Sequence, residues 1–464
     1  MISEALLHRL VTAASRAPSA DNMQAWSFAA AGDVVDVYVE PGRVLPTDVD
    51  AMFAWVGLGA AVENLVIAAE DEGFGVTVDD GGLGDGTSGD REPVRVRLSP
   101  GGSGSGSRSG HPLAGWIERR ETNRGPYDET PLDPTTLGEL TEAVGRFDAG
   151  VHWIGGSADL GLMASMDARS SYIRLEHRPL HDELFDILRF SRRSVEETGF
   201  GLDFASLGVP PALVGAARLL RYPSVMKVVS HLGIGRFVAR QLAAKLCAAG
   251  AVCLVTARRA GPAGYVEAGR AMERLWLAAT ARELAVQPYG VLPQYLTKLD
   301  VEPEGFLPRY AEVMRGHREP FAGLFPGARD EHPAIVLRVG RPREQPPRRS
   351  VRLPVDQLIR SGREPLLTSR PAIAAIRHRG AGGWRTGRVS SQDAGGRRAA
   401  SAVATVWTAI KRASQAVPRA NEAATSEGQC TARNTRVPPA ASAPARARSP
   451  IVVRRSWDQT RGER

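Results

Sequence analysis

The fold is decided by the stretch GAAVENLVIAA (Gly59–Ala69), which returns 210 residues later as GRAMERLWLAA (Gly269–Ala279). A glycine, a glutamate, a leucine and a closing pair of alanines coincide at matching places. The apolar residues recur at the spacing of an amphipathic helix, and the first stretch lies in a helix predicted over about 47–73. Small residues at the start of both stretches would permit close helix–helix approach. Chance similarity between alanine-rich helices is one explanation; the other is a duplicated unit whose halves pack on each other as in a fused dimer.

Further helices and strands are predicted on either side of these stretches. A helix is predicted at about 3–16, followed by a strand with period-2 alternation at Val34–Val39. A second strand, Pro93–Leu98, follows the long helix. The second half has strand patterns at Ala251–Thr256 and Ala334–Val339. Each half therefore combines helices with short strands.

Composition marks the boundaries between the parts. A first half-unit is expected over 1–100, followed by a Gly/Ser-rich linker, 101–112, that includes the sequence GGSGSGS. A second half-unit is expected over 113–355, with an insertion at about 165–235. The last part, 356–464, differs in composition and forms a separate C-terminal tail.

The formal charge of +8 conceals a difference between body and tail. Residues 361–464 carry 19 Lys or Arg against 6 Asp or Glu, so the remaining chain has a net charge of −5. An acidic body argues against nucleic-acid binding, which needs basic residues concentrated on one surface. The tail is rich in Arg, Ala, Ser, Gly and Pro and cannot bury enough apolar surface to offset chain ordering. We expect a disordered extension, with a nucleic-acid-binding arm or out-of-frame read-through as the alternatives.

Cysteine usage and hydropathy indicate a cytoplasmic protein. The three cysteines show no metal-ligand spacing and no disulfide framework, which suits a reducing compartment. The N-terminus lacks the charged and apolar regions of a secretory signal. No segment offers about 18 uninterrupted apolar residues. We therefore expect no membrane span, no metal site and a cytoplasmic location.

One candidate binding segment is APSADNMQAW, Ala17–Trp26. Pro18 ends the preceding helix, so Ser19 and Asn22 fall in a loop whose backbone N–H groups are not used by secondary structure. Such amides and short side chains can bind the carbonyl edge of a flat polar heterocycle, while Trp26 anchors the loop in the core. From these residue types alone, a plain helix break is the simpler explanation.

Arginines supply the second candidate. The segment WIERRETNRGPY, Trp116–Tyr127, has three Arg within six residues beside a Thr hydroxyl, a set that can bind phosphate through charge-assisted hydrogen bonds. A solvated, charged helix face is the alternative. Three more Arg follow the last predicted strand within PPRRSVRLP, 346–354. In VQPYG, Val286–Gly290, the glycine would let the backbone approach a ligand closely, or would only make a turn.

Together these segments resemble the nitroreductase superfamily of FMN oxidoreductases, and more closely its single-chain, internally duplicated actinobacterial branch, the Acg-like NAD(P)H nitroreductases. The family pattern APSxxNxQPW is matched by Ala17–Trp26, with Ala25 in place of the usual Pro. The flavin-phosphate motif, Arg-x-Ser/Thr-x-Arg/Lys, is matched by Arg120, Thr122 and Arg124.

Two further motifs extend the resemblance. The Arg pair before the C-terminal arm of the family is matched by Arg348 and Arg349, and a stretch typical of the branch is matched from Gly269 through Pro288. The four motifs stand in the expected order, and the resemblance covers about 1–358. It implies an α+β, nitroreductase-like fold, with two pseudo-symmetric half-units and antiparallel-rich sheets flanked by helices.

The resemblance also implies one FMN in a composite site. The first half has the Ala-Pro-Ser loop and the second half has the Arg-x-Thr-x-Arg motif, so one chain would complete the site as a monomer or within a homodimer. The phosphate and ribityl end is expected at Arg120, Thr122, Arg124 and one or both of Arg348 and Arg349. The isoalloxazine edge is expected at Pro18, Ser19, Ala20 and Asn22. The opposite edge is expected at Gln287, Pro288 and Gly290.

The implied activity is NAD(P)H-dependent reduction of a nitroaromatic, quinone or flavin-like acceptor. Donor and acceptor would use the same pocket in turn, a ping-pong scheme that needs no protein nucleophile. No histidine stands in a recognisable triad or metal motif; His177 and His181 are the best candidates for a further role. The alternative is a protein that binds or sequesters FMN with little turnover, its pocket covered by the insertion at about 165–235.

Overall fold

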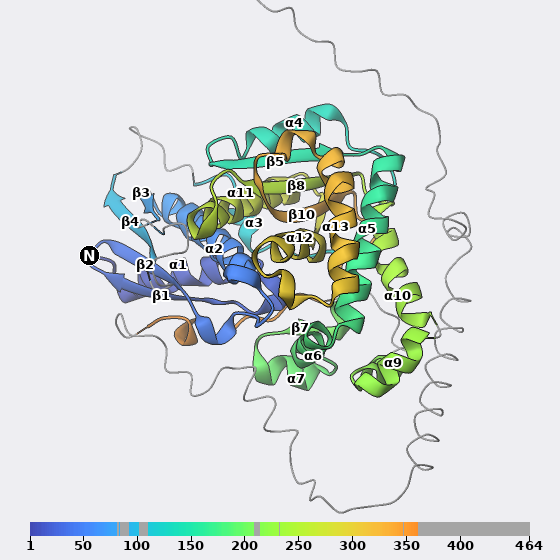
Figure 1. Ribbon diagram of the computed structural model, residues 1–464. Helices are drawn as coiled ribbons and strands as arrows, with labels where there is room; N and C mark the ends of the chain where they lie inside the picture. Colours follow the sequence, from blue (N-terminus) through green and yellow to red (C-terminus); the bar gives the residue numbers. More distant parts are fainter. Residues whose placement is uncertain are drawn as a thin grey trace, which may run out of the picture. The chain divides into compact units, whose positions relative to one another are not determined.

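The computed structural model describes residues 1–80, 83, 92–101, 110–207, 214–231, 233–346 and 348–360. The tail beyond residue 360, most of the Gly/Ser linker and part of the predicted insertion lie outside the described residues. The described body is a mixed α/β protein with two four-stranded antiparallel sheets (Figure 1).

The first sheet uses strands from the N-terminal hundred residues, in the order β1-β2-β4-β3. Its strands are β1 (Trp26–Ala31), β2 (Val34–Val39), β3 (Phe74–Asp79) and β4 (Val94–Pro100). The predictions at Val34–Val39 and Pro93–Leu98 are confirmed. The sequence analysis did not anticipate β1, whose alanines show no alternation, or β3, which begins directly after the long helix.

The second sheet has the order β5-β8-β10-β9. Its strands are β5 (Ala149–Ile154), β8 (Ala251–Ala257), β9 (Ala285–Tyr289) and β10 (His332–Gly340). The strands predicted at Ala251–Thr256 and Ala334–Val339 are confirmed as β8 and β10. A short parallel pair, β6 (Leu188–Arg189) and β7 (Leu202–Asp203), stands apart from both sheets.

Side chains that accept hydrogen bonds from the first backbone N–H groups determine where the first two α-helices begin. Helix α1 (Glu4–Ser15) starts after Ser3, whose hydroxyl accepts from the Leu6 N–H. Helix α2 (Met52–Asp71) starts later than predicted, because the Asp48 carboxylate accepts from the N–H groups of Phe53 and Ala54.

Eleven more α-helices lie within the described residues. They are α3 (Ala114–Ile117), α4 (Pro134–Glu142), α5 (Ser157–Glu176), α6 (Arg178–Ile187), α7 (Arg192–Thr198), α8 (Val214–Leu220), α9 (Pro223–His231), α10 (Ile234–Ala243), α11 (Gly261–Ala281), α12 (Val291–Val301) and α13 (Pro308–Leu324). Helices α5 to α10 lie between β5 and β8 in the sequence, where the insertion was expected.

Helices α2 and α11, which carry the two similar stretches, pack against each other (Figure 1). A Cβ placed on Gly59 would lie 2.1 Å from the carbonyl oxygen of Val266. A Cβ placed on Gly269 would lie 2.0 Å from the carbonyl oxygen of Val56. Both glycines are therefore required by backbone contact, and the predicted close approach of small residues is confirmed. Gly269 stands 210 positions after Gly59, and Val266 stands 210 positions after Val56. The same glycine–valine contact is therefore made twice, once from each helix.

Helix α2 belongs to the core. The helix spanning Val49–Asp71 is long and apolar enough to cross a membrane by length and composition, but 83% of its apolar window is buried inside the protein. Its carboxylate Glu63 is fully buried and is held by Arg274 at 2.5 Å, Arg146 at 2.6 Å and Arg270 at 3.2 Å. These arginines compensate the one acid that the helix carries into the core.

The C-terminal segment of the body returns to the first sheet. Phe28 of β1 donates its N–H to Leu358 and accepts from the N–H of Arg360. The Arg360 side chain donates to Ser27 at 2.7 Å and pairs with Glu40 at 3.3 Å. The boundary predicted at residue 355 therefore falls too early, because Leu358 is fully buried and the pairing continues through 360.

Candidate functional site

The Ala-Pro-Ser loop follows α1 in a strained conformation. Asp21, Asn22 and Gln24 have φ values of 47°, 59° and 52°, in the left-handed region that non-glycine residues rarely adopt. Ser19 accepts from the Gln24 N–H at 2.9 Å, which closes the turn. Strain of this kind persists only where the surroundings impose it, and it is common at ligand sites.

The loop is held by side chains on its far side. The Asn22 amide donates to the carbonyl of Val351 at 3.1 Å and its oxygen accepts from Arg352 at 2.8 Å. The Gln24 amide donates to Gly199 and accepts from the Leu353 N–H, both at 2.9 Å. Both the nitrogen and the oxygen of the Asn22 side-chain amide are therefore hydrogen-bonded, and Asn22 holds the loop in place.

The Arg-rich segment runs along the edge of β9. Thr122 forms a parallel bridge with Val286, and the Asn123 N–H donates to the Val286 carbonyl at 3.1 Å. This pairing places Thr122 and Arg124 beside Gln287, although they are more than 160 residues apart in sequence. The segment is an added strand edge rather than the charged helix face that was the alternative.

Arg120 is the most buried member of the predicted motif. Its Nε lies 3.1 Å from Glu273, its Nη2 donates to the Arg16 carbonyl at 2.6 Å, and its guanidinium stacks on Trp276 with 4.6 Å to the ring centroid. Burial raises the pKa of Glu273 to about 7, an effect that Arg120 partly offsets. The Arg120 charge is therefore matched within the protein.

The two arginines predicted near the C-terminus behave differently. Arg349 faces Glu121 at 3.6 Å and lines the cavity described below. Arg348 faces Asp203 at 3.9 Å, is half exposed and is not among the lining residues.

Arg352, which was not predicted, holds the end of α1. Its guanidinium donates to the carbonyls of Ser15, Arg16 and Ala17 at 2.7, 3.1 and 3.1 Å. These are carbonyls that a helix end leaves without helical partners. Burial lowers the pKa of Arg352 to about 9.

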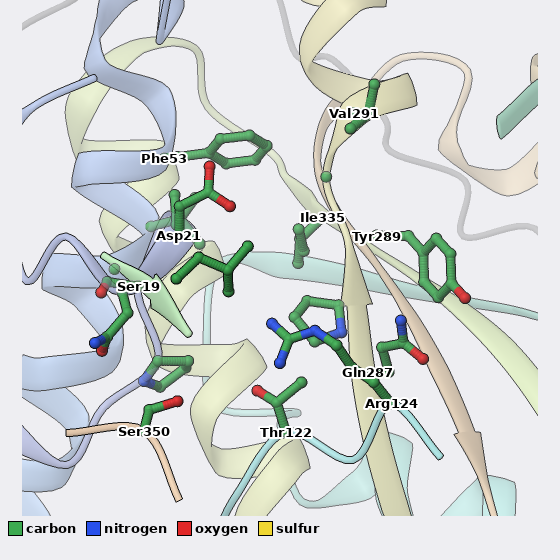
Figure 2. A pocket seen from close by; sticks show the side chains of 18 of the residues that line it. Ser19, Asp21, Phe53, Thr122, Arg124, Gln287, Tyr289, Val291, Ile335 and Ser350 are labelled. Carbon is green, nitrogen blue, oxygen red and sulfur yellow. The ribbon is translucent and has the colours of Figure 1, made fainter. Parts of the chain in front are cut away.

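These elements enclose a cavity of about 310 Å³ (Figure 2), at the lower end of the roughly 300–1,000 Å³ usual for small-molecule sites. Of the twelve residues predicted for the cofactor, all but Arg348 line it: Pro18, Ser19, Ala20, Asn22, Arg120, Thr122, Arg124, Gln287, Pro288, Gly290 and Arg349. Segments from the beginning, middle and end of the body thus meet at one space within a single chain.

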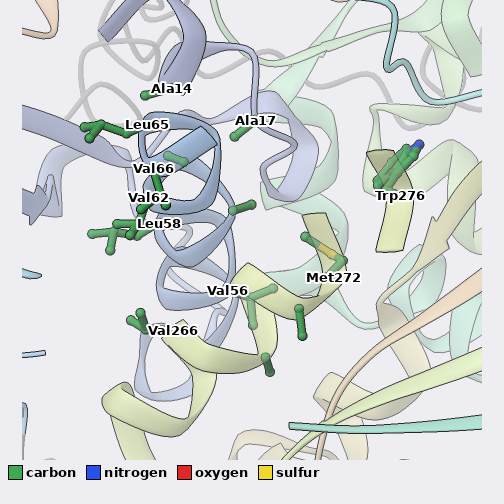
Figure 3. Close-up of a cluster of buried hydrophobic side chains, with 14 of the residues drawn as sticks. Ala14, Ala17, Val56, Leu58, Val62, Leu65, Val66, Val266, Met272 and Trp276 are labelled. Atoms are coloured by element: carbon green, nitrogen blue, oxygen red, sulfur yellow. The ribbon is translucent and has the colours of Figure 1, made fainter. Parts of the chain in front are cut away.

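One wall of the cavity is apolar. Phe53 and Val56 of α2 line it together with Met272 and Trp276 of α11 and Ile335 of β10. Figure 3 shows Val56, Met272 and Trp276 on these two helices, so the wall continues directly into the helix–helix core. This surface suits a flat ring, and the Arg-containing segment supplies a polar region beside it.

A further set of lining residues was missed by the sequence analysis. They come from α5, α6, β7 with the turn after it, and α10 with the turn after it: Asp167, Ser171, Arg174, Glu183, Leu202, Leu207, Leu242 and Lys245. Arg174 pairs with Asp21 of the loop at 2.6 Å, and Glu183 accepts from the Thr47 N–H and hydroxyl at 2.8 and 2.6 Å. The insertion therefore contacts the N-terminal loops across the cavity.

Asp167 differs from the other acids of the cavity. The residue is 2% exposed, and its carboxylate accepts a hydrogen bond from the Ser171 hydroxyl at 3.4 Å. Burial raises the pKa of Asp167 to about 7. It therefore lies in the cavity wall without a cation beside it among the described residues.

The two histidines singled out from the sequence are structural. His177 packs edge-on against Tyr310 and near Phe306, and His181 contacts the Leu220 carbonyl through Nε2 at 2.8 Å. Neither lines the cavity. Within the described ranges, no group of three or more His, Cys, Asp or Glu side chains could hold a metal.

Comparison with known proteins gives distant likenesses. No protein-family model matches the chain. An uncharacterized protein of Mycobacterium tuberculosis (strain CDC 1551 / Oshkosh) is 23% identical over 332 residues, which are 70% of this chain and 44% of that protein. The chain therefore spans less than half the length of the curated relative that it matches.

Among solved structures, the chain is similar to a nitroreductase with bound FMN from Bacteroides fragilis, at 12% identity over 50% of this chain and 88% of that one, with a TM-score of 0.27. An FMN and NADPH-dependent nitroreductase from Sphigopyxis sp. strain HMH is 15% identical over 54% and 98%, with a TM-score of 0.30. An FMN-dependent nitroreductase from Mycobacterium smegmatis in complex with NADPH is 14% identical over 53% and 96%, with a TM-score of 0.28. At these scores the likenesses decide neither the family nor the function of the chain.

Proposed function

We propose that the chain binds one FMN in this cavity and is an oxidoreductase of the nitroreductase type. One observation carries the proposal: the three motifs that resemble the flavin-binding segments of that family line the same cavity. They are the loop Pro18–Asn22, the segment Arg120–Arg124 and the strand end Gln287–Gly290. If the loop were only a helix break and the arginine segment only a solvated helix face, the two segments would not be expected to line one cavity.

The lining chemistry fits a flavin mononucleotide. The apolar wall of Val56, Met272 and Trp276 can pack on an isoalloxazine ring, and Arg124 extends into the middle of the cavity (Figure 2). We assign Thr122, Arg124 and Arg349 to the phosphate and ribityl end. Arg120 supports that end, with its charge already matched by Glu273.

The remaining predicted residues are assigned by position. Pro18, Ser19 and Ala20 would contact one edge of the ring, while Asn22 holds the loop in place. Gln287, Pro288 and Gly290 would contact the other edge. Arg348, which faces Asp203, receives no role.

When bound, the flavin would accept reducing equivalents from NAD(P)H and pass them to a nitroaromatic, quinone or flavin-like acceptor. The protein's own residues bind and orient the participants and exclude water. No protein nucleophile is required. A cytoplasmic location and a monomeric or homodimeric state remain predictions.

Internal duplication is part of the proposal. The reciprocal contacts of Gly59 with Val266 and Gly269 with Val56 support it, because a two-fold interface brings equivalent residues together in this way. The two sheets also share a succession of four antiparallel strands. The half-units would then be 1–100 and 113–360.

A second candidate is an FMN-binding protein with little turnover. It is favoured by the side chains that the insertion places in the cavity wall, above all Arg174 on Asp21 and Glu183 on Thr47. A wall held by these contacts could exclude a nicotinamide donor while retaining the flavin. The acceptor would be excluded for the same reason.

Flavin titration tests the proposal. We expect the purified full chain to quench FMN fluorescence at one equivalent per chain, and Arg124→Met to weaken this binding about 10-fold or more. Arg240→Met, which removes an exposed arginine of α10 outside the cavity, is the matched control and should bind as wild type. Absence of FMN binding by the wild type would refute the proposal.

Reduction distinguishes the two candidates. NADPH is added anaerobically to the FMN-loaded chain, and the flavin absorbance is followed. Loss of the oxidised band within seconds indicates the oxidoreductase. An oxidised band that persists while FMN remains bound indicates the binding protein.

A further inference from the structure

Most charges of the cavity are matched by a partner. Arg16 pairs with Glu118 at 2.8 Å, Arg349 with Glu121 at 3.6 Å and Arg174 with Asp21 at 2.6 Å. As described above, Arg120 has Glu273, and Arg352 has a set of backbone carbonyls. Two lining cations remain, Arg124 and Lys245, and neither forms an ion pair with any described residue.

The two remaining cations lie together. The Lys245 ammonium donates to the backbone carbonyl of Arg124 at 2.7 Å. Lys245 belongs to the short turn Ala244–Leu246 that precedes β8, and Arg124 belongs to the segment along β9. Their contact brings two uncompensated charges from distant parts of the chain to one side of the cavity. The carboxylate whose field acts on Arg124 is that of Asp21, and it is already bound to Arg174.

A third cation adds to the positive potential at this place. Arg338 of β10 is fully buried, stacks on Tyr127 with 3.5 Å to the ring centroid, and donates to the Gly125 carbonyl and the Gln287 side chain. It too has no carboxylate partner among the described residues. Burial, with Arg338 and Arg124 nearby, lowers the pKa of Lys245 to about 8.

Arg124 and Lys245 are half-buried and Arg338 is buried, and proteins normally pair charges that are partly or fully withdrawn from water. Their retention here indicates that the counter-ion is a ligand. Lys245 reaches the backbone of Arg124 and both side chains line the cavity. Guanidinium and ammonium groups are the donors that bind an oxyanion through short, charge-assisted hydrogen bonds. Thr122, two residues before Arg124 on the same strand edge, adds a hydroxyl.

We propose that Arg124 and Lys245 form an oxyanion subsite in the cavity, with Arg338 behind it. This rests on the proposed function for the identity of the larger ligand. The anion has two possible sources with the same chemistry: the phosphate of the cofactor, or an acidic group on the second substrate. Lys245 is the distinctive residue, since it comes from the turn between α10 and β8 and not from the motifs that resemble the nitroreductases.

Lys245→Met tests the subsite, because methionine keeps the length and the apolar stem but removes the charge. Lys245→Gln, which keeps a donor for the Arg124 carbonyl, is the second variant and guards against a folding defect in the first. Arg240→Met on α10 is the charge-matched control. Melting temperatures without ligand establish that each variant is folded.

Four probes are titrated against each variant. FMN and riboflavin, which differ by the phosphate, are followed by fluorescence quenching. 4-Nitrobenzoate and nitrobenzene, which differ by the carboxylate, are followed by perturbation of the flavin spectrum of the FMN-loaded chain.

If the cofactor supplies the anion, both Lys245 variants bind FMN roughly 10- to 100-fold more weakly and bind riboflavin as wild type. If the second substrate supplies the anion, the affinity for both flavins is unchanged, and of the two nitro compounds only 4-nitrobenzoate binds more weakly, by a similar factor. Either result supports the subsite. Equal losses for charged and neutral probes, or no loss beyond that of Arg240→Met, overturn it.

Inorganic phosphate separates this inference from the proposed function. If the wild type binds no flavin, the proposed function fails, and phosphate is titrated alone against thermal unfolding at constant ionic strength. Stabilisation of the wild type and of Arg240→Met, but not of Lys245→Met, then supports the subsite. The same stabilisation of all three proteins, or of none, overturns it.

Discussion

Gly59 of α2 lies so close to Val266 of α11 that a Cβ on the glycine would stand 2.1 Å from the valine carbonyl oxygen. The same relationship joins Gly269 to Val56. The interface between the two helices is therefore a backbone contact made twice, and the apolar wall of the cavity is built on the helices that make it.

Gly59→Ala should separate these helices. Because the obstructing atom is backbone, the cost should resemble overpacking of a core, about 2–3 kcal/mol of unfolding free energy in urea. Gly316→Ala on α13, where a Cβ would meet nothing within 4 Å, is the control and should stabilise by about 0.5–1 kcal/mol. Equal stabilities for the two variants would contradict the packing described.

Arg352→Met should destabilise the end of α1 and the loop after it. The guanidinium satisfies three backbone carbonyls and the Asn22 oxygen, and its loss leaves them without these donors, at a cost of about 2–4 kcal/mol in urea unfolding. Arg343→Met, at an exposed position of the same C-terminal segment, should change stability by less than about 0.5 kcal/mol. A loss no larger than that of Arg343→Met would show that the arginine is not needed there.

The adjacent arginines Arg348 and Arg349 should differ in their effect on flavin binding. Arg349 lines the cavity, so Arg349→Met should weaken FMN binding about 10-fold. Arg348 faces Asp203 away from the cavity, so Arg348→Met should leave the affinity within about twofold of wild type. Fluorescence titration of both variants decides the matter, and the reverse order of effects would argue against this cavity as the FMN site.

Asp167→Asn should stabilise the protein in a pH-dependent way. Burial raises the pKa of Asp167 from 3.8 to about 7, so the native state retains its proton over a range in which the unfolded chain has lost it. The resulting cost is absent below about pH 4, grows between pH 4 and 7 and is complete above 7. Asparagine mimics the protonated acid at every pH.

The unfolding free energy of wild type and Asp167→Asn is therefore compared at pH 4.5 and pH 8. The gain from the substitution should be small at pH 4.5 and on the order of 2–4 kcal/mol at pH 8. All other titrating groups are shared by the two proteins, so the difference reports on Asp167. The same gain at both pH values would mean that Asp167 is ionised in the native state throughout.

Short sequence patterns were enough to predict much of this structure. Alternating Val residues predicted β2 and β4, and helical periodicity predicted α1, α2 and α11. The motifs at Pro18–Asn22, Arg120–Arg124 and Gln287–Gly290 predicted the lining of the cavity, because each motif is short and lies on a backbone that positions it whole.

Other residues could not be found in this way. Arg174 and Lys245 belong to helical and turn segments whose sequence carries no motif. Arg174 reaches Asp21 of the loop and Lys245 reaches the backbone of Arg124 only through the path of the chain in space. Arg120 was predicted by its motif, but its pairing with Glu273 depends on packing between segments about 150 residues apart. Arg348 and Arg349 are neighbours in sequence, and only the direction of the backbone separates their roles.

The return of the C-terminal segment to β1 has a consequence for synthesis on the ribosome. Phe28 emerges more than 300 residues before its backbone partners Leu358 and Arg360. The apolar face of α2 likewise stays uncovered until α11 has been synthesised. The nascent chain must therefore remain without its cavity, and with an apolar helix uncovered, until translation has passed residue 360. That interval is when an early-binding chaperone would have the greatest influence on the yield of native protein.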